Sequence, residues 1–231
     1  IWDMPDPVLW TESGPGPNSV AVIPGSTEDE VWVVVSRVIG GQLVRYLEQM
    51  QPRSVDDQED CWFVDSGLSL DTADADGIVS GLGHLEGEEV AALVDGAIVA
   101  RQTVSGGSIN VGQAIAGKAI AGLPFRYKLK PMRFDMNIEG TTKGSVKRIP
   151  EVIASFYKSG NVWYGVDEDH LFRIDWRTEE PYGTPPALHT GDKLLNPEGG
   201  FDAEDTFIIT GDDPLPCIIR ALIPHITSIG R

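Results

Sequence analysis

The sequence predicts an all-β, antiparallel fold. A meander resembling a propeller blade or a sandwich sheet would form the main body, and a small β-barrel or sandwich domain would be inserted in it. Residues 79–123 contain three runs rich in β-forming residues: Glu89–Val94, Ala97–Val104 and Ser108–Val111. Asp95-Gly96 separates the first two runs, and a type I′ hairpin turn favours this dipeptide because both central positions need φ > 0. Ser105-Gly106-Gly107 provides a second turn, and 26 Gly and 16 Pro across the chain indicate frequent turns and few helical residues.

Residues 1–65 predict an antiparallel meander behind an extended N-terminal segment. The first 18 residues contain four prolines, and their apolar side chains are candidates for packing on another part of the body: Trp2, Val8, Leu9 and Trp10. Three strands are expected next: Ser19–Ile23, Val31–Ile39 and Gln42–Glu48. Glu28-Asp29-Glu30 and Gly40-Gly41 supply the turns, and the long apolar run from Val31 is typical of a central strand.

The remaining elements follow from the same signals. After the acidic loop Gln51–Asp60, Cys61–Val64 is expected as a short closing strand and Ser66–Gly77 as a linker. Beyond Pro124 the predicted strands are Tyr127–Pro131, Pro150–Tyr157, Val162–Tyr164, Thr206–Thr210 and Cys217–Ile226. Residues 137–145 and 166–204 are expected as loops, and Ser159-Gly160-Asn161 as a turn. We therefore divide the chain into a meander of the main body (1–65), a small inserted β domain (66–148) and strands that complete the main body (149–231).

The net charge of −17, from 35 acidic and 18 basic residues, argues against a protein that grips nucleic acid through its phosphates. The charge is uneven, because residues 1–65 hold twelve acids and three bases whereas residues 118–148 hold eight bases and two acids. Such segments of opposite sign suggest contact between neighbouring subunits or domains, and two solvated faces are the alternative.

Cys61 and Cys217 both stand beside apolar residues, so the sequence favours two buried thiols over a disulfide. No apolar run approaches the ~20 residues of a transmembrane helix, and no membrane span is predicted.

No residue is predicted to be catalytic, to bind a cofactor or to hold a metal, and the chain is not expected to be an enzyme. Aligning residues 71–77 (DTADADG) with a calcium-binding loop puts Thr72 at the first ligand position and Gly83 where a bidentate Glu is required, so the match fails. Adjacent ligands such as Asp167-Glu168-Asp169-His170 rarely converge on one ion. The other three histidines, His84, His189 and His225, are expected to be structural. Five aromatic residues are candidates either for a sugar site or for a sheet core: Trp62, Phe63, Trp163, Tyr164 and Trp176.

Several phrases of the sequence carry a resemblance to a known family. They read, in chain order, SVAVIPGSTEDEVWVVVSRVIGGQLVRYLEQM (19–50), GLGHLEGEEVAALVDGAIV (81–99), TVSGGSINV (103–111), GSVKRIPEVIASFYKSGNVWYG (144–165), PPALHTGDKLLNPEGGFD (185–202) and PLPCIIRALIPHITS (214–228). Together they resemble the C-terminal part of the tail nozzle, or tail tubular protein B, of short-tailed phages. The chain departs from the family in retaining a single basic dipeptide, Lys147-Arg148, and in the loop 166–184. Relatives in this family are several times longer, so we expect the chain to be a C-terminal portion.

The resemblance implies a virion protein of the phage tail that assembles as a ring of identical copies, six in the family, around the path of ejected DNA. The implied partners are other copies of the chain and other tail proteins such as the adaptor and fibre, with transient passage of DNA. Two alternatives are a tail-displayed module that binds a host-surface glycan or attaches a fibre, and a glycan hydrolase acting through a carboxylate pair.

The negative charge leads to a first prediction. A DNA channel works best when its wall does not hold phosphates, and acidic groups repel the duplex over about 8 Å at physiological salt. We therefore expect part of an acidic set to face a lumen and the basic stretch 126–148 to face a neighbouring subunit or a partner protein. The alternative is that all these acids lie outside and aid solubility. The acidic set comprises Glu28, Asp29, Glu30, Asp56, Asp57, Glu59 and Asp60. In a filter-binding assay at physiological salt, the isolated chain should not retain duplex DNA, and retention would contradict the hypothesis.

Overall fold

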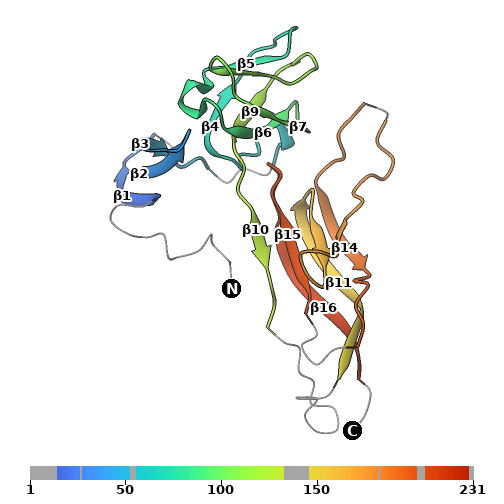
Figure 1. Cartoon of the computed structure of the whole chain (residues 1–231). Coiled ribbons are helices and arrows are strands. Elements are labelled where there is room, and N and C mark those ends of the chain that lie inside the picture. The colour runs from blue at the N-terminus through green and yellow to red at the C-terminus, as the bar shows by residue number, and fades with distance from the viewer. Residues whose placement is uncertain are drawn as a thin grey trace. The chain divides into compact units, whose positions relative to one another are not determined.

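The computed structural model describes residues 15–26, 28–52, 56–132, 146–181, 183–201 and 206–228. Of these residues, 53% belong to β structure and 4% are helical, the sheets are antiparallel, and none closes into a barrel. The predicted all-β antiparallel class is confirmed. The chain forms two compact units, one ending at Phe125 and the other beginning at Arg126 (Figure 1). Within the described residues, no helix has the length and apolar character needed to cross a membrane.

The first unit begins with a three-stranded sheet, called the meander sheet below. Its strands are β1 (Gly16–Ile23), β2 (Glu30–Ile39) and β3 (Gln42–Gln49), with β2 in the middle (Figure 1). Ile39 pairs with Gln42, so Gly40 and Gly41 alone make the turn, and their φ angles of 56° and 76° are those of a type I′ loop. A β-bulge at Asn18 interrupts the β1–β2 pairing, and the Asn18 amide oxygen accepts a 2.6 Å hydrogen bond from the Ser36 hydroxyl.

Two further sheets complete the first unit. One has the order β4 (Asp65–Leu70), β9 (Ala119–Leu123), β6 (Glu89–Val94) and β7 (Ala97–Thr103), and the other pairs β5 (Ile78–Ser80) with β8 (Ser108–Asn110). The short 3₁₀ helix η3 (Leu82–Leu85) joins them, and a second one, η2, spans Gln58–Asp60. Side chains from both sheets and η3 share one core: Val79, Leu82, Leu85, Val90, Ala92, Val94, Ile109, Ala119 and Ala121. The arrangement is sandwich-like, which is one of the two predicted alternatives.

Carboxylates hold the tight turns of this sandwich. Asp95 (φ 48°) and Gly96 (φ 76°) form the predicted two-residue hairpin between Val94 and Ala97. The Asp95 carboxylate also accepts hydrogen bonds from the backbone N–H groups of three residues of a separate loop, Ala116, Gly117 and Lys118, at 2.7–3.0 Å. The second predicted turn, at Gly106 and Gly107, donates two backbone hydrogen bonds of 2.8 and 2.7 Å to the Glu86 carboxylate.

The second unit contains two sheets that face a common core. One has the order β10 (Tyr127–Leu129), β15 (Ile208–Gly211), β12 (Trp163–Gly165) and β13 (Leu171–Arg173). The other, called the β11 sheet below, has β11 (Lys147–Ser159) between β14 (His189–Leu195) and β16 (Ile219–Ser228). Alternate residues of β11, namely Val152, Ala154 and Phe156, enter the core. There they meet residues from other parts of the unit: Val162, Ile174, Trp176, Leu195, Phe207 and Ile209. Pro150 lies where the β11–β16 register shifts, as expected of a residue that cannot donate to the ladder.

The structure corrects several predicted elements. The expected linker Ser66–Gly77 contains most of β4, which pairs with β9, whereas Cys61–Val64 forms no strand and instead places Cys61 and Val64 in the interior. The expected loop 166–204 contains β13 and β14, and neither β5 nor β9 was predicted as a strand. Strand β14 was not predicted because its sequence (HTGDKLL) is mostly polar. The composition fits the structure, in which Leu195 is the one residue of β14 that is fully buried in the core.

Some expectations stay open. Trp2, Val8, Leu9, Trp10 and the loop 137–145 lie outside the described residues. The prediction that residues 1–65 and 149–231 form one body with an insertion between them concerns how the two units are placed, and it stays a prediction.

The Asp95 clamp gives a second prediction. Burial by itself would raise the pKa of Asp95, but the three backbone donors outweigh this effect and lower it. Because the folded pKa is lowered, the stabilising effect is present above the ordinary Asp pKa of about 3.9 and is lost as pH falls through the folded value. Asp95→Asn should therefore cost about 1–2 kcal/mol in urea unfolding at pH 7, and clearly less at pH 2.

Asp76→Asn is the matched control, because Asp76 is exposed and its side chain has no hydrogen-bond partner among the described residues. An equal effect of the two variants at pH 7 would contradict the role assigned to Asp95.

Candidate assembly surface

The residues considered as metal ligands do not converge in this structure. In the segment 71–77, the Asp74 carboxylate accepts the backbone N–H groups of Asp76 and Ile78 at 2.9 and 3.2 Å, so it closes a turn. Asp71 contacts Lys118 at 3.5 Å. Within the described residues, no group of three or more His, Cys, Asp or Glu side chains could hold a metal ion.

The acidic run at 167–170 makes two separate local structures. Asp167 accepts hydrogen bonds from the backbone N–H groups of Asp169 and His170 and contacts the His170 ring, and these contacts lower the pKa of Asp167. Glu168 points elsewhere and forms ion pairs with Lys128 and Arg126. The first two cations of the basic stretch 126–148 are therefore engaged within their own unit.

His84, His189 and the cysteines lie in buried or half-buried positions, whereas His225 is exposed. His84 Nε2 hydrogen-bonds to the Ser66 carbonyl oxygen at 2.8 Å, and the His189 ring packs on Trp176 with 5.5 Å between ring centroids. Burial, together with nearby Lys193, lowers the pKa of His189. His225 lies 3.3 Å from the Glu151 carboxylate. Both cysteines are free thiols.

Three of the five aromatic candidates pack in or against the cores of the two units. Trp62 packs against a small cluster of Val64, Ala91 and Ile120 in the first unit, and Phe63 is half-buried. In the second unit, Trp176 is buried against Phe156, and Tyr164 packs beside Phe172 and Phe207, next to Trp163 on β12. The core role that the sequence left open is therefore the one observed for Trp62, Tyr164 and Trp176.

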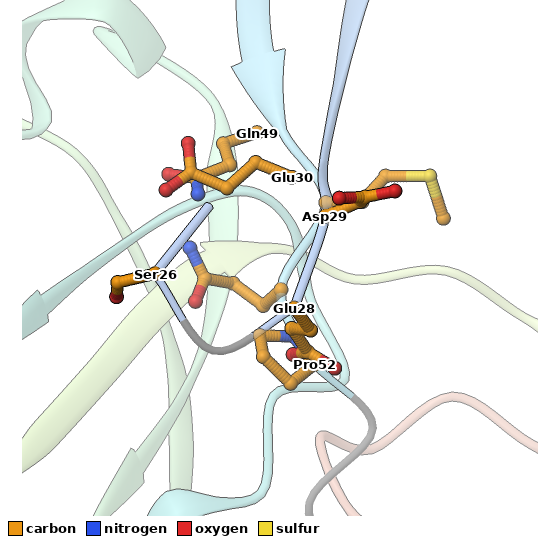
Figure 2. Close-up of a pocket in the computed structure, with 8 residues that line it drawn as sticks. Ser26, Glu28, Asp29, Glu30, Gln49 and Pro52 are labelled. Atoms are coloured by element: carbon orange, nitrogen blue, oxygen red, sulfur yellow. The ribbon is translucent and has the colours of Figure 1, made fainter. Parts of the chain in front are cut away.

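An acidic depression lies where the meander sheet ends. It has a volume of about 250 Å³ and is lined by Ser26, Glu28, Asp29, Glu30, Gln49, Met50, Gln51 and Pro52 (Figure 2). The side chains of Glu30 and Asp29 extend to opposite sides, and Glu30 accepts a 3.0 Å hydrogen bond from the Trp32 indole. Because the carboxylates of Asp29 and Glu30 do not converge on one position, we do not assign a bound ion to the depression.

The meander sheet exposes apolar side chains to solvent. Pairing between β2 and β3 places Val34 beside Leu47 and Val38 beside Leu43 on one face, and Ile23 of β1 lies on this face as well. These five residues define the Leu47 face. Four of them are exposed, and Leu47 is 66% exposed.

The opposite face of the meander sheet is also apolar. It presents Val20 and Val22 from β1 beside Val33 and Val31 of β2, and Val20 is 67% exposed. The apolar run of β2 is typical of a strand buried on both faces. Edge strand β1 is long and has no charged residue, which makes it a ready template for pairing with another strand.

One end of the sheet is nevertheless held firmly by a polar network. The Arg37 guanidinium donates two hydrogen bonds of 2.8 Å to the Glu48 carboxylate and one of 3.4 Å to Asp65. The Ser66 hydroxyl donates to Glu48, and the Tyr46 hydroxyl donates to the His84 carbonyl oxygen at 2.6 Å. The network therefore ties the Tyr46 side of the sheet to β4 and η3, and within the part of the chain that the structure describes the Leu47 face stays uncovered.

Comparisons with known proteins identify no family for this chain. No protein-family model matches the sequence, and a search of curated proteins finds no similar protein. The uncovered sheet and the sequence phrases quoted above are therefore the features that bear on function. The apolar run of β2 is evident in the sequence, but no local pattern there indicates that its neighbours are exposed.

The polar network gives a third prediction. Burial would raise the pKa of Glu48, but its hydrogen bonds with Arg37 and Ser66 and the Arg37 charge outweigh this effect and lower it. The stabilisation is therefore present above the ordinary Glu pKa of about 4.3 and is lost as pH falls through the lowered folded value. At pH 7, Glu48→Gln should cost about 2 kcal/mol of unfolding free energy, because Arg37 loses its bidentate partner.

Glu89→Gln is the matched control, because Glu89 is exposed and meets Arg101 at 3.7 Å, and it should cost less than about 0.5 kcal/mol. In a double-mutant cycle, Arg37→Met with Glu48→Gln should cost clearly less than the sum of the single losses. Additive losses would rule out the proposed coupling.

Proposed function

We propose that this chain is a structural subunit of a bacteriophage tail, located in the nozzle or hub ring through which DNA is ejected. The observation that carries the proposal is the uncovered meander sheet. An exposed contiguous apolar surface marks an interaction site, and a sheet that is apolar on both faces is complete only when other surfaces cover it. A subunit of a permanent assembly has this property, because much of its core is formed between chains.

The sequence phrases supply the kind of assembly. Their resemblance to nozzle proteins covers most of the chain in the family's order, and the all-β antiparallel fold agrees with that resemblance. On this proposal the partners are further copies of the chain, six per ring in the family, together with the adaptor and fibre proteins of the tail. The protein resides in the virion.

The charge of the chain suits a path for DNA. Glu28, Asp29 and Glu30 form an acidic group at one end of the meander sheet, and the chain as a whole carries −17. Negative charge discourages the phosphate contacts that would slow a moving duplex. Some of the other predicted lumen acids also have local roles, since Asp57 caps η2 and Asp60 pairs with Lys118.

The proposal is tested on purified particles of the virus that encodes the chain. Mass spectrometry should recover its peptides from intact, nuclease-treated particles, and a cryo-EM map should place the fold in a ring on the tail axis. Recovery of the chain only from the soluble fraction of infected cells would contradict the proposal. A position at the tip of a fibre, or release of sugar from host envelope material by the purified chain, would favour the binding module or the hydrolase instead.

A further inference from the structure

A second sheet of this chain also leaves an apolar face uncovered. Pairing of β11 with β14 and β16 places Leu194, Ile153 and Ile223 side by side across all three strands. These residues define the Ile153 face. Leu194 is 55% exposed and Ile223 is 53% exposed. The opposite face of the β11 sheet is buried in the core of its own unit, so the Ile153 face points away from that core.

Each uncovered face carries one exposed charged residue without an ion-pair partner among the described residues, and these two charges are opposite. On the Leu47 face, Arg45 stands between Leu43 and Leu47 and is exposed, with no ion-pair partner among the described residues. On the Ile153 face, Asp192 is exposed two residues from Leu194 and has no ion-pair partner among the described residues. Glu151 lies on the same face but already pairs with His225, and Glu30 lies opposite Ile23 on the Leu47 face. Packing the two faces together would pair Arg45 with Asp192 instead of leaving both charges unpaired.

We propose that the Leu47 face of one copy packs on the Ile153 face of the next copy, so that two three-stranded sheets form a sandwich across the subunit boundary. This inference rests on the proposed assembly of identical copies. Because the two faces differ, the contact is heterologous. Every copy then offers one free face of each kind, and a heterologous contact generates a closed ring when the rotation between copies closes.

The expected size of the contact decides how it must be measured. A face of three strands and about eight residues covers ~14 Å by ~26 Å, or on the order of 400 Å². This is roughly half of the ~800 Å² per partner found in stable complexes. The isolated contact is therefore weak, and closure of the ring supplies the remaining stability through high local concentration. Covalent trapping is a sharper test than solution mass.

The test uses two variants of the whole 231-residue chain, Leu47→Cys and Ile223→Cys, purified separately and mixed at about 1 mM, the order of local concentration in a linked assembly. A short bis-maleimide then traps neighbouring thiols. The native thiols give little background, because Cys61 is buried and burial raises the pKa of Cys217 to about 11, which keeps it protonated and unreactive. A covalent dimer should form in the mixture and not in either variant alone.

Val20→Cys is the matched control, because Val20 is as exposed as Leu47 but lies on the other face of the meander sheet. Its mixture with Ile223→Cys should give about tenfold less dimer, the difference expected when only one of two equally reactive thiols is positioned by the contact. Arg45→Glu in the Leu47→Cys chain should reduce the dimer yield, and Asp192→Arg in the partner chain should restore it. This reciprocal rescue would not arise from a merely structural effect of either substitution.

Three results would overturn the inference: no dimer at this concentration, equal dimer from the Val20→Cys mixture, or a link formed only within one chain when both cysteines are placed in it. The inference and the proposed function fail separately. If the particle contains the ring but the cross-link does not form, the proposed interface is wrong and the proposed function stands. If the cross-link forms but virus particles do not contain the chain, the proposed function is wrong and the interface stands.

Discussion

Each sheet of this protein carries apolar side chains that must leave water, and the way each one does so organises the molecule. The sandwich of the first unit and the pair of sheets in the second unit bury their inner faces in continuous cores, around Leu82 and Val90 in one and Phe156 and Trp176 in the other. Among the described residues, no other element covers the Leu47 face of the meander sheet or the Ile153 face of the β11 sheet. These two surfaces are where the chain most needs another protein surface.

Carboxylates account for much of the local order of the turns, and this gives the acidic composition a structural meaning. Asp74, Asp95 and Asp167 accept backbone N–H groups within loops, and Glu86 holds the Gly106-Gly107 turn. Ionised carboxylates are strong acceptors for such donors, so a turn-rich β protein has a use for many of them. The negative charge therefore serves turn geometry as well as the solution behaviour expected of a protein that does not grip DNA.

The proposed role and the proposed interface depend on different observations. The resemblance of the sequence phrases suggests which assembly the chain serves, whereas the uncovered faces suggest how neighbouring copies contact one another. The Arg37–Glu48 network bears on both proposals, because it fixes the meander sheet to β4 and η3 at one end. A sheet held in this way can present the Leu47 face in a defined orientation to a partner, which a freely moving hairpin could not do.

Local signals in the sequence determined the fold class and the tight turns, because the φ > 0 requirement at Asp95-Gly96, Gly40-Gly41 and Gly106-Gly107 depends only on neighbouring residues. Strands β4 and β14 could not be predicted, since each is stabilised by pairing with a strand distant in the sequence, and their own residues look like loop. The sequence placed Leu47 and Ile223 in predicted strands, Gln42–Glu48 and Cys217–Ile226. Only the tertiary structure decided that both remain exposed, because burial depends on which other elements cover a face and no short segment contains that information.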